Sequence, residues 1–496
     1  KSAGTAGTNG LGSAAGGTTV RSGAVLDLYG QFIGAEPLAI AGFGNNYGVA
    51  LLNSHATLDA TLNGPVTLDG DTAFSVSTAA KKLTLGGAIT GAYGIEKIGA
   101  GIVVLGNSAN GYTGDTLVRA GTLRLGTANA IPDGVGKGDV HLIGTLDLAG
   151  NSETINGLNG QGGITCSVAG APVLTVGTND ANGAYYGAIV NGSGTVGLTK
   201  IGSGVLTLAS TASTFTGPTR IEGGTLRATT DADALGGAGS LELAGGNLEL
   251  ANDASLTMTK RNTTVSADAD ITVDRLKSAG AGVTVTLGTL AIGSHQVDVK
   301  AGNLVTSGTA GLVFGAVTLS GSPTFTVTDP LNGGGTKLTI GALGGTGDLT
   351  MDSQSLVAGN GIFLTGASTH TGDVILKNNG SATGGITVSG AMGHTGDLIL
   401  QNNGSAASGI TVSGGPNITG QIVNEGTGSN TVVISGIIGP NVTAVRQESA
   451  TSVLTLTGAN TFTCGLTVGS NRMVRVNNAT GSATGSGTVA IAGGGT

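Results

Sequence analysis

Short runs in which apolar residues alternate with polar or small ones recur along the whole chain. Examples are KLTLGGAIT (82–90), VLTLAS (205–210), LELAGGNLEL (241–250) and GVTVTLGTLAI (282–292). Alternation with a period of two is typical of a β-strand that buries one face. Glycine or Asn-Gly pairs interrupt the runs every few residues, as tight turns require. No stretch with a 3.6-residue period exceeds two turns, so the pattern predicts an all-β chain.

The longest repeat of this pattern aligns residues 94–124 with 197–227 without a gap. Apolar positions exchange only for apolar ones, and a looser copy lies within 452–476. No cluster of charged residues recurs with the repeat, which keeps an aromatic position, glycine corners and alternating strands. The residues that we expect to hold this repeated shape are Tyr112, Gly114, Gly121, Phe215, Gly217, Gly224 and Phe462.

A shorter repeat is sharper. Residues 370–393 (HTGDVILKNNGSATGGITVSGAMG) are followed at once by 394–417 (HTGDLILQNNGSAASGITVSGGPN), and 17 positions of the 24-residue period are identical. Adjacent copies of this length are typical of a parallel β-solenoid, in which each copy is one coil that pairs with its neighbours. The repeats therefore predict an all-β fold, a parallel β-helix with roughly 20–24 residues per coil.

Alternation within the first short copy predicts which side chains fill the core. Val374, Leu376, Ile386 and Val388 are expected to point inward, and Asp373, Lys377 and Thr387 outward. Residues one period apart should stack along the solenoid. We therefore expect amide ladders in which Asn378 lies over Asn402 and Asn379 over Asn403.

The distribution of repeats predicts three consecutive sections of one solenoid. Section 1–250 holds the two long repeats, section 251–440 holds the 24-residue coils, and section 441–496 continues the solenoid with the partial copy.

Composition agrees with such a fold. Glycine supplies 95 of the 496 residues, tryptophan is absent, and 10% of residues are charged against about 25% in typical domains. Glycine shows no period of three, which excludes collagen. Low charge and a mean hydropathy of +0.27 argue against disorder. Small side chains suit the narrow core of a solenoid.

Charge and cysteine content exclude several classes of protein. A net charge of −8 without a Lys/Arg stripe argues against a nucleic-acid partner. No apolar run reaches the ~18 residues of a membrane-spanning helix, and the opening KSAGTAGTNG lacks a signal-peptide pattern. Cys166 and Cys464 form neither a disulfide framework nor a zinc pattern, so we expect free thiols that are buried like small apolar side chains.

The segment 94–126 resembles the autotransporter-associated β-strand repeat, also called the passenger-associated transport repeat. The usual pattern of that family reads L-x-K-x-G-x-G-x-L-x-L-x-G-x-N-x-[YF]-T-G-x-T-x-[VI]-x-x-G-T-L. The resemblance is specific over 48–152, good over 197–250 and partial over 452–496, whereas 251–440 is similar only in style.

The resemblance implies a secreted, right-handed parallel β-helix at a bacterial surface. It also implies a repeat that assists secretion and folding, without catalytic residues or cofactors. Complete members end in a β-barrel with aromatic girdles. The last residues here, GSGTVAIAGGGT, carry no aromatic side chain, so we expect the translocator to lie outside this sequence.

The start (12–28) and the end (481–496) of the sequence carry versions of one motif. Two explanations compete. The chain is one section of a longer repeat protein, or copies stack end to end through open strand edges in a contact that does not close. The expected partners are therefore the chain itself or its own continuation.

Two groups of residues are weak candidates for metal ligands. His370 and His394 should stack one coil apart and could share an ion, but no third ligand repeats with them, so a pair at a coil corner is favoured. Asp268, Asp270 and Asp274 could supply oxygen ligands to Ca²⁺. They lack the loop of an EF-hand and the GGxGxD motif, so a solvated strand face is favoured there, and we expect no bound metal or cofactor.

Polysaccharide lyases and hydrolases also use β-helices, with clustered carboxylates, basic residues and aromatic platforms. The dispersed acids, six tyrosines and missing tryptophan of this chain favour a protein that is not an enzyme. The predicted function is that of a stiff structural section of a secreted bacterial surface or extracellular fibre. The first alternative is an autotransporter adhesin passenger that binds a cell-surface or matrix ligand. A polysaccharide-active enzyme is a distant alternative.

Overall fold

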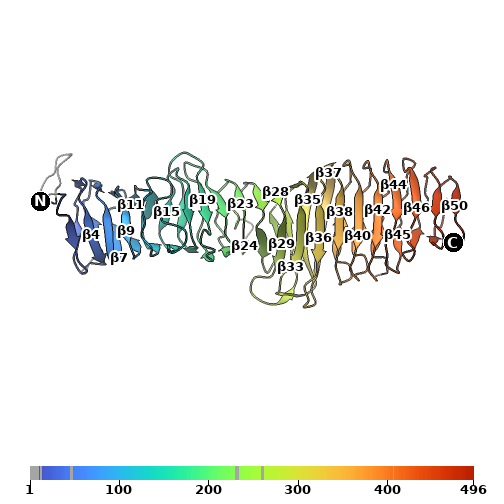
Figure 1. Ribbon diagram of the computed structural model, residues 1–496, viewed down its shortest axis with the longest axis horizontal. Coiled ribbons are helices and arrows are strands. Elements are labelled where there is room, and N and C mark those ends of the chain that lie inside the picture. The colour runs from blue at the N-terminus through green and yellow to red at the C-terminus, as the bar shows by residue number, and fades with distance from the viewer. Residues whose placement is uncertain (1–10, 12–13, 45–47, 230–233, 259–261, 406) are drawn as a thin grey trace. The chain divides into compact units, whose positions relative to one another are not determined.

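The computed structural model describes residues 11, 14–44, 48–229, 234–258, 262–405 and 407–496. All elements in these residues are β-strands, and every described strand pairing is parallel (Figure 1). The prediction of an all-β parallel solenoid is confirmed. The chain divides into two compact units, Lys1–Ser240 and Leu241–Thr496. The first boundary lies near the predicted one, and the predicted sections 251–440 and 441–496 share the second unit.

The first unit winds its strands into three faces. The first face contains β1 (Thr18–Val20), β2 (Leu26–Asp27), β4 (Leu38–Gly42), β5 (Leu51–Asn53), β7 (Val66–Val76), β9 (Ile89–Gly91), β10 (Ile95–Ile98), β12 (Thr116–Val118), β14 (Val140–Leu142), β17 (Leu158–Gly160), β20 (Gly183–Tyr185), β22 (Val205–Leu208) and β24 (Thr225–Thr229). The second contains β3 (Phe32–Ile33), β6 (Ala60–Leu62), β8 (Lys82–Leu85), β11 (Ile102–Leu105), β13 (Thr122–Leu125), β15 (Thr145–Asp147) and β18 (Gly163–Thr165). The third contains β16 (Glu153–Ile155), β19 (Val173–Val176), β21 (Gly197–Lys200) and β23 (Thr219–Ile221).

The second unit has two long faces and a small strand pair. One face contains β26 (Asn247–Ala251), β29 (Ala269–Asp274), β33 (Gln296–Ala301), β36 (Thr324–Thr328), β38 (Leu349–Ser353), β40 (Val374–Asn378), β42 (Leu398–Asn402), β44 (Gln421–Asn424), β46 (Ala444–Gln447), β48 (Leu466–Val468) and β50 (Val489–Ile491). The other contains β25 (Leu241–Ala244), β27 (Leu256–Met258), β28 (Thr263–Ala267), β31 (Thr284–Leu287), β32 (Leu290–Ile292), β35 (Thr309–Ser320), β37 (Gly335–Thr346), β39 (Gly361–Leu364), β41 (Ile386–Val388), β43 (Ile410–Val412), β45 (Val432–Ile434), β47 (Leu454–Leu456) and β49 (Val474–Val476). The small pair is β30 (Gly280–Ala281) with β34 (Val305–Ser307).

Strand register gives the length of each coil. Val374 pairs with Leu398 and Leu398 with Ile422, so both coils have the 24 residues of the short repeat. Elsewhere the spacing ranges from 18 residues between Val140 and Leu158 to 28 between Ile271 and Val299. The longer coils carry their extra residues in loops between strands. The strands themselves stay short and in register.

The core consists of the inward side chains of these strands. In β40, residues Val374, Leu376 and Asn378 are buried, and the residues between them are partly exposed. Ile386 and Val388 of β41 are fully buried as well. Each buried branched side chain contributes about 1.5–3 kcal/mol relative to an exposed one. Many small contributions, each shared between adjacent coils, therefore hold the solenoid together.

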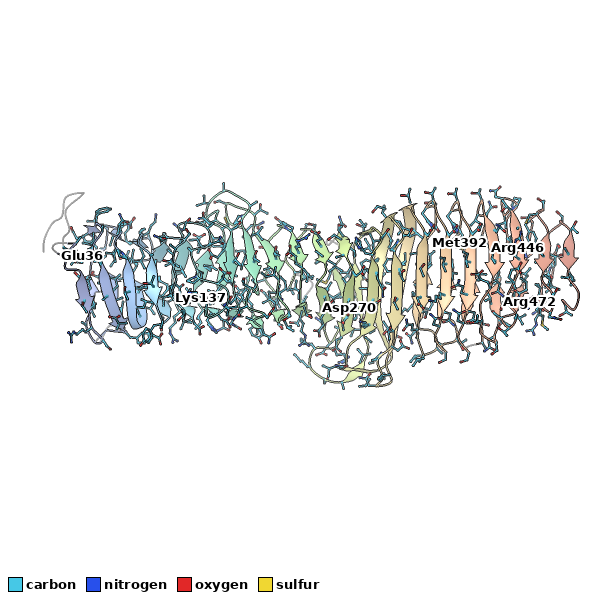
Figure 2. The ribbon with its side chains drawn as sticks, viewed as in Figure 1. Glu36, Lys137, Asp270, Met392, Arg446 and Arg472 are labelled. Atoms are coloured by element: carbon cyan, nitrogen blue, oxygen red, sulfur yellow. The ribbon has the colours of Figure 1, made fainter. Side chains whose placement is uncertain are left out.

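Cations on the outside of the solenoid bond to the preceding coil (Figure 2). Lys137 Nζ donates to the carbonyl oxygen of Gly111 at 2.7 Å, and Arg446 Nε donates to Gln421 Oε1 at 2.8 Å. Arg472 Nε donates in the same way to the carbonyl oxygen of Glu448 at 2.8 Å. The few charged side chains of the chain thus join coils as well as face solvent.

One loop of the second unit is held by a buried carboxylate. Asp329 Oδ1 accepts a hydrogen bond from the backbone N–H of Thr336 at 2.6 Å. Its Oδ2 accepts from Ser355 Oγ and from the N–H groups of Leu356 (2.7 Å) and Val357 (3.0 Å) on the next coil. Because a single side chain accepts all four bonds, it fixes both ends of the loop 329–336 and ties that loop to its neighbour.

In the described part of the chain, no helix is long and apolar enough to span a membrane.

Candidate functional site

Each long repeat buries one lysine at a glycine corner. Lys97 of β10 is 1% exposed, and its Nζ donates to the carbonyl oxygens of Ile98 and Gly99 at 2.7 and 2.8 Å. A third bond of 2.9 Å goes to the carbonyl oxygen of Ala120 on the next coil. The three donors of an ammonium group thus meet three acceptors. Lys97 therefore closes its own corner and ties it to the following coil.

The second long repeat builds the same arrangement around Lys200 of β21, which is fully buried. Its Nζ donates to the carbonyl oxygens of Ile201 and Gly202 at 2.5 and 3.0 Å, and to that of Gly223 on the next coil at 3.2 Å. Burial lowers the pKa of Lys97 to about 8 and also lowers that of Lys200. Both side chains are therefore mainly ammonium ions at pH 7.

The glycines of the same corners have no room for a side chain. Gly121 has a φ of +62° and Gly224 a φ of +58°, in the left-handed region that favours glycine. A Cβ on Gly121 would lie 2.4 Å from the carbonyl oxygen of Gly99, and one on Gly224 would lie 2.3 Å from that of Gly204. The repeated glycine thus follows from close contact between successive coils.

The repeated aromatic residues fill the core beside these corners. Tyr112, Phe215 and Phe462 are buried, and Tyr112 Oη lies 2.6 Å from Thr116 Oγ1. Burial raises the pKa of the Tyr112 hydroxyl. Gly114 and Gly217 pass against the backbone of the coil before them, so that an added Cβ would lie 2.3 and 2.2 Å from backbone atoms.

The buried lysines were not among the repeat positions selected from the sequence. A signal was present, because Lys97 and Lys200 occupy equivalent positions of the two long copies and share the inward face of their strands with Ile95 and Leu198. A cation at an inward position that recurs in both copies indicates a buried charge with its own acceptors.

Glu153 of β16 joins two coils from inside the first unit. It is 1% exposed, and its Oε2 and Oε1 accept the backbone N–H groups of Ala130 and Ile131, each at 2.9 Å. Burial, and to a lesser degree the charge of Asp133, raises the pKa of this carboxyl to about 8. Glu153 therefore holds a proton at neutral pH in the folded chain.

Replacing Glu153 with glutamine is expected to remove a pH dependence from the stability of the first unit. A raised pKa stabilises the fold below the unfolded value, near 4.5, and this contribution is lost as the pH rises to about 8. At about 1.4 kcal/mol per pKa unit, the loss is about 2–4 kcal/mol. Urea unfolding of both proteins at several pH values measures it. Parallel pH profiles for the variant and the wild type would contradict this assignment.

His370 and His394 lie in the core rather than at the surface. Their ring centroids are 5.0 Å apart with 23° between the planes, and the residues are 1% and 0% exposed. His370 Nδ1 lies 3.1 Å from Ser368 Oγ. Near-parallel rings point their nitrogens in the same direction rather than toward a common ion. Among the described residues, no group of three His, Cys, Asp or Glu side chains could hold a metal.

The three candidate aspartates do not converge on one point. Asp268 Oδ1 accepts the N–H of Gln296, and Asp270 Oδ2 pairs with Lys300 Nζ at 2.7 Å. Asp274 is buried, and its Oδ1 accepts the N–H groups of Arg275 (2.7 Å) and Leu304 (3.1 Å). Asp268 and Asp270 line an open groove, where Lys300 would compete with any added cation.

The asparagines of the short repeat form two ladders. Inside the core, Asn378 Nδ2 donates to Asn402 Oδ1 at 2.9 Å, and both residues are fully buried. On the outside, Asn403 Nδ2 donates to Asn379 Oδ1 at 3.0 Å. The carboxylates of the repeated TGD corners also act between coils, because Asp373 Oδ1 accepts the N–H of Asp397 at 2.7 Å.

Both cysteines are free, but only one of them is buried. Cys166 lies in the core, and its thiol donates to the carbonyl oxygen of Val168 at 2.9 Å. Cys464 is exposed, so the expectation that both thiols are buried is wrong for this residue. Cys464 stands in the corner before β48, where side chains project away from the core.

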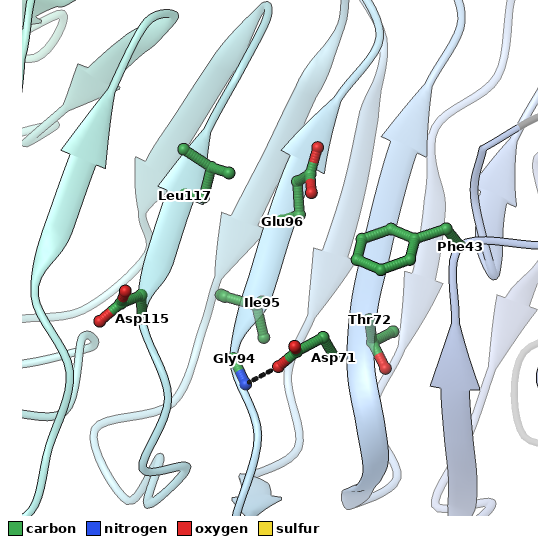
Figure 3. A pocket seen from close by; sticks show the side chains of 8 residues that line it. All are labelled: Phe43, Asp71, Thr72, Gly94, Ile95, Glu96, Asp115 and Leu117. Carbon is green, nitrogen blue, oxygen red and sulfur yellow. Dashed lines mark hydrogen bonds between the residues drawn. The ribbon is translucent and has the colours of Figure 1, made fainter.

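An open groove lies on the first face of the first unit and holds about 220 Å³ (Figure 3). Its lining combines an aromatic ring with carboxylates from successive coils, and the full set is Phe43, Asp71, Thr72, Gly94, Ile95, Glu96, Asp115 and Leu117. Phe43 is 44% exposed, so one wall of the groove is apolar and accessible.

The carboxylates of this groove already have partners. Asp71 Oδ1 accepts the N–H of Gly94 at 2.8 Å, and Asp115 Oδ1 accepts that of Asp139 at 2.9 Å. Glu96 forms an ion pair with Arg119. Each carboxylate keeps further acceptor capacity toward the open side, so the groove can contact hydroxyl or cationic groups of a ligand. Sequence reasoning missed it because its residues come from separate coils.

Comparison with known proteins agrees with the repeat geometry. The family model for the passenger-associated transport repeat matches residues 95–125 and 198–228, the segments that contain Lys97 and Lys200. No solved structure matches this chain.

The chain is also similar to the adhesin BmaC autotransporter of Brucella suis biovar 1 (strain 1330). The two sequences are 34% identical over 219 residues, which cover 42% of this chain and 6% of the adhesin. This chain therefore carries two passenger-associated transport repeats on a parallel β-solenoid and is related to a part of an autotransporter adhesin.

Proposed function

We propose that this chain is part of an autotransporter passenger and acts outside the bacterial cell as a stiff, non-catalytic β-solenoid. The observation that carries the proposal is the pair of matched repeats, each with its own buried lysine corner. Such corners bind each new coil to the last one. A chain that emerges end first can therefore fold coil by coil, because every coil offers a strand edge to the next.

The same surface supports a role in adhesion. The relative is an adhesin by name, and the chain exposes a groove with an aromatic wall and hydrogen-bonding carboxylates. The adhesin function therefore competes with the purely structural one. In both, the solenoid holds its outer faces away from the cell. In the structural function, contact with the continuation of a longer chain or with another copy extends a fibre.

Cell binding separates the two functions. The exposed Cys464 allows labelling of the native protein with a maleimide dye, whereas Cys166 is buried. Saturable binding of the labelled protein to cultured host cells, lost when the protein is first unfolded, is expected for an adhesin. A C464S variant exposed to the dye controls for labelling elsewhere. Absence of binding favours the structural function.

Electron microscopy and a glycan assay test the rest of the proposal. Negative-stain images at increasing protein concentration are expected to show rods, either of constant length or joined into filaments that grow with concentration. Globular particles would contradict a stiff solenoid. Release of new reducing ends from a panel of polysaccharides would overturn the non-catalytic assignment.

A further inference from the structure

The stacked histidines belong to a column that runs through three coils. The backbone N–H of Thr395 donates to the carbonyl oxygen of His370, and that of Thr419 to the carbonyl oxygen of His394, both at 3.2 Å. The next residue of this column is Ile418, which is fully buried. The chain thus accepts an aliphatic side chain at the position where two successive coils carry imidazoles.

The two imidazoles lack the partners that buried polar groups normally have. A neutral imidazole has one N–H donor and one acceptor nitrogen. His370 Nε2 and both ring nitrogens of His394 have no hydrogen-bond partner, although both residues are buried. An unpaired buried polar group destabilises the fold, and an unpaired buried charge does so far more. The corner therefore tolerates the neutral pair and disfavours its protonated form.

The charges that face the pair do not neutralise it from inside. Asp348 and Asp373 are the carboxylates whose charge acts on His370, and both stand on the outer side of the TGD corner. Their Oδ1 atoms already accept the backbone N–H groups of Asp373 (2.9 Å) and Asp397 (2.7 Å). The principal charge acting on His394 is that of His370 itself, which would repel it.

We propose that the stacked pair His370–His394 is an acid-sensitive latch in the second unit. At neutral pH both rings are uncharged and the corners of β40 and β42 stay closed. In mildly acidic surroundings the rings take up protons, and two like charges about one coil spacing apart open these corners. The rest of the solenoid keeps its pairing. This inference does not depend on the proposed function.

The direction of the pH effect follows from the titration of the pair. Burial lowers the pKa of His394 to about 4, and it also lowers the pKa of His370. The closed corner therefore binds protons more weakly than the open one. Its stability is fully present above the unfolded pKa of 6.5 and is lost as the pH falls toward 4. For His394 alone, the open state gains about thirtyfold at pH 5 relative to pH 8.

Hydrogen exchange with mass spectrometry tests the latch in the full chain. After correction for intrinsic rates, amides of 368–402 are expected to exchange at least about tenfold faster at pH 5 than at pH 8. Amides of 95–125 in the first unit serve as the internal reference. The matched variant is H370I/H394I, which places the natural Ile418 side chain at both positions. This variant is expected to show no acid-dependent opening of 368–402.

Two results would overturn the proposal. If the double variant opens in acid as the wild type does, the corner carboxylates are responsible and the histidines are not. If NMR of the ¹³C-histidine-labelled wild type shows His370 and His394 titrating near 6.5 without local opening, the pair is not buried in solution. The NMR measurement needs only the wild-type protein, so it remains decisive if the double variant fails to fold.

Discussion

Replacing Lys97 with methionine is expected to lower the free energy of unfolding of the first unit by about 3–5 kcal/mol. Methionine keeps much of the packing of the lysine stem but has no donor for the carbonyl oxygens of Ile98, Gly99 and Ala120. Each buried carbonyl left without a donor costs about 1–3 kcal/mol. Removing the charge returns part of its desolvation cost, which has lowered its pKa to about 8. The carbonyl groups remain in place, so their loss dominates.

Urea unfolding followed by circular dichroism measures this change. K200M is a natural replicate, because Lys200 has the same three types of carbonyl partner. The control is K81M, since Lys81 is only partly buried, at the turn before β8, and is expected to change stability by less than about 0.5 kcal/mol. Losses below about 1 kcal/mol in both K97M and K200M would contradict the role assigned to the ammonium groups.

Replacing Asp329 with alanine is expected to destabilise the second unit by about 3–5 kcal/mol. Four donors, from Thr336, Ser355, Leu356 and Val357, lose their common acceptor. Hydrogen bonds to a charged group contribute about 1.5–3 kcal/mol each. The expected total is smaller than their sum, because water reaches part of a loop that opens. The loss should appear first as faster amide exchange at residues 336 and 355–357.

D329N is the matched variant for this carboxylate. An amide keeps the shape and one acceptor oxygen but replaces the other oxygen with a donor, so an intermediate loss is expected. D298N serves as the control, because Asp298 lies on an exposed strand face and its Oδ1 accepts from a neighbouring glutamine side chain. If D329A unfolds with the wild-type urea midpoint, the loop is held by the strands around it and the carboxylate is dispensable.

Much of the candidate sites could be anticipated, but their environment could not. A period of 24 residues is enough to place His370 over His394 and Asn378 over Asn402, because equal positions of equal coils stack. Burial of the imidazoles depends on which way the corner turns, and the sequence shows no sign of that. Cys464 illustrates the same point, since its exposure depends on the corner before β48.

The sequence by itself determined the strands, the repeat and the solenoid, because alternation and period are properties of neighbouring residues and of equal spacings. Only the tertiary structure decided which side chains meet between coils. Coil length varies from 18 to 28 residues, so the partner of a given side chain on the next coil cannot be found by counting. The carbonyl groups around Lys97, the donors around Asp329 and the wall that Phe43 adds to an acidic groove all come from such contacts.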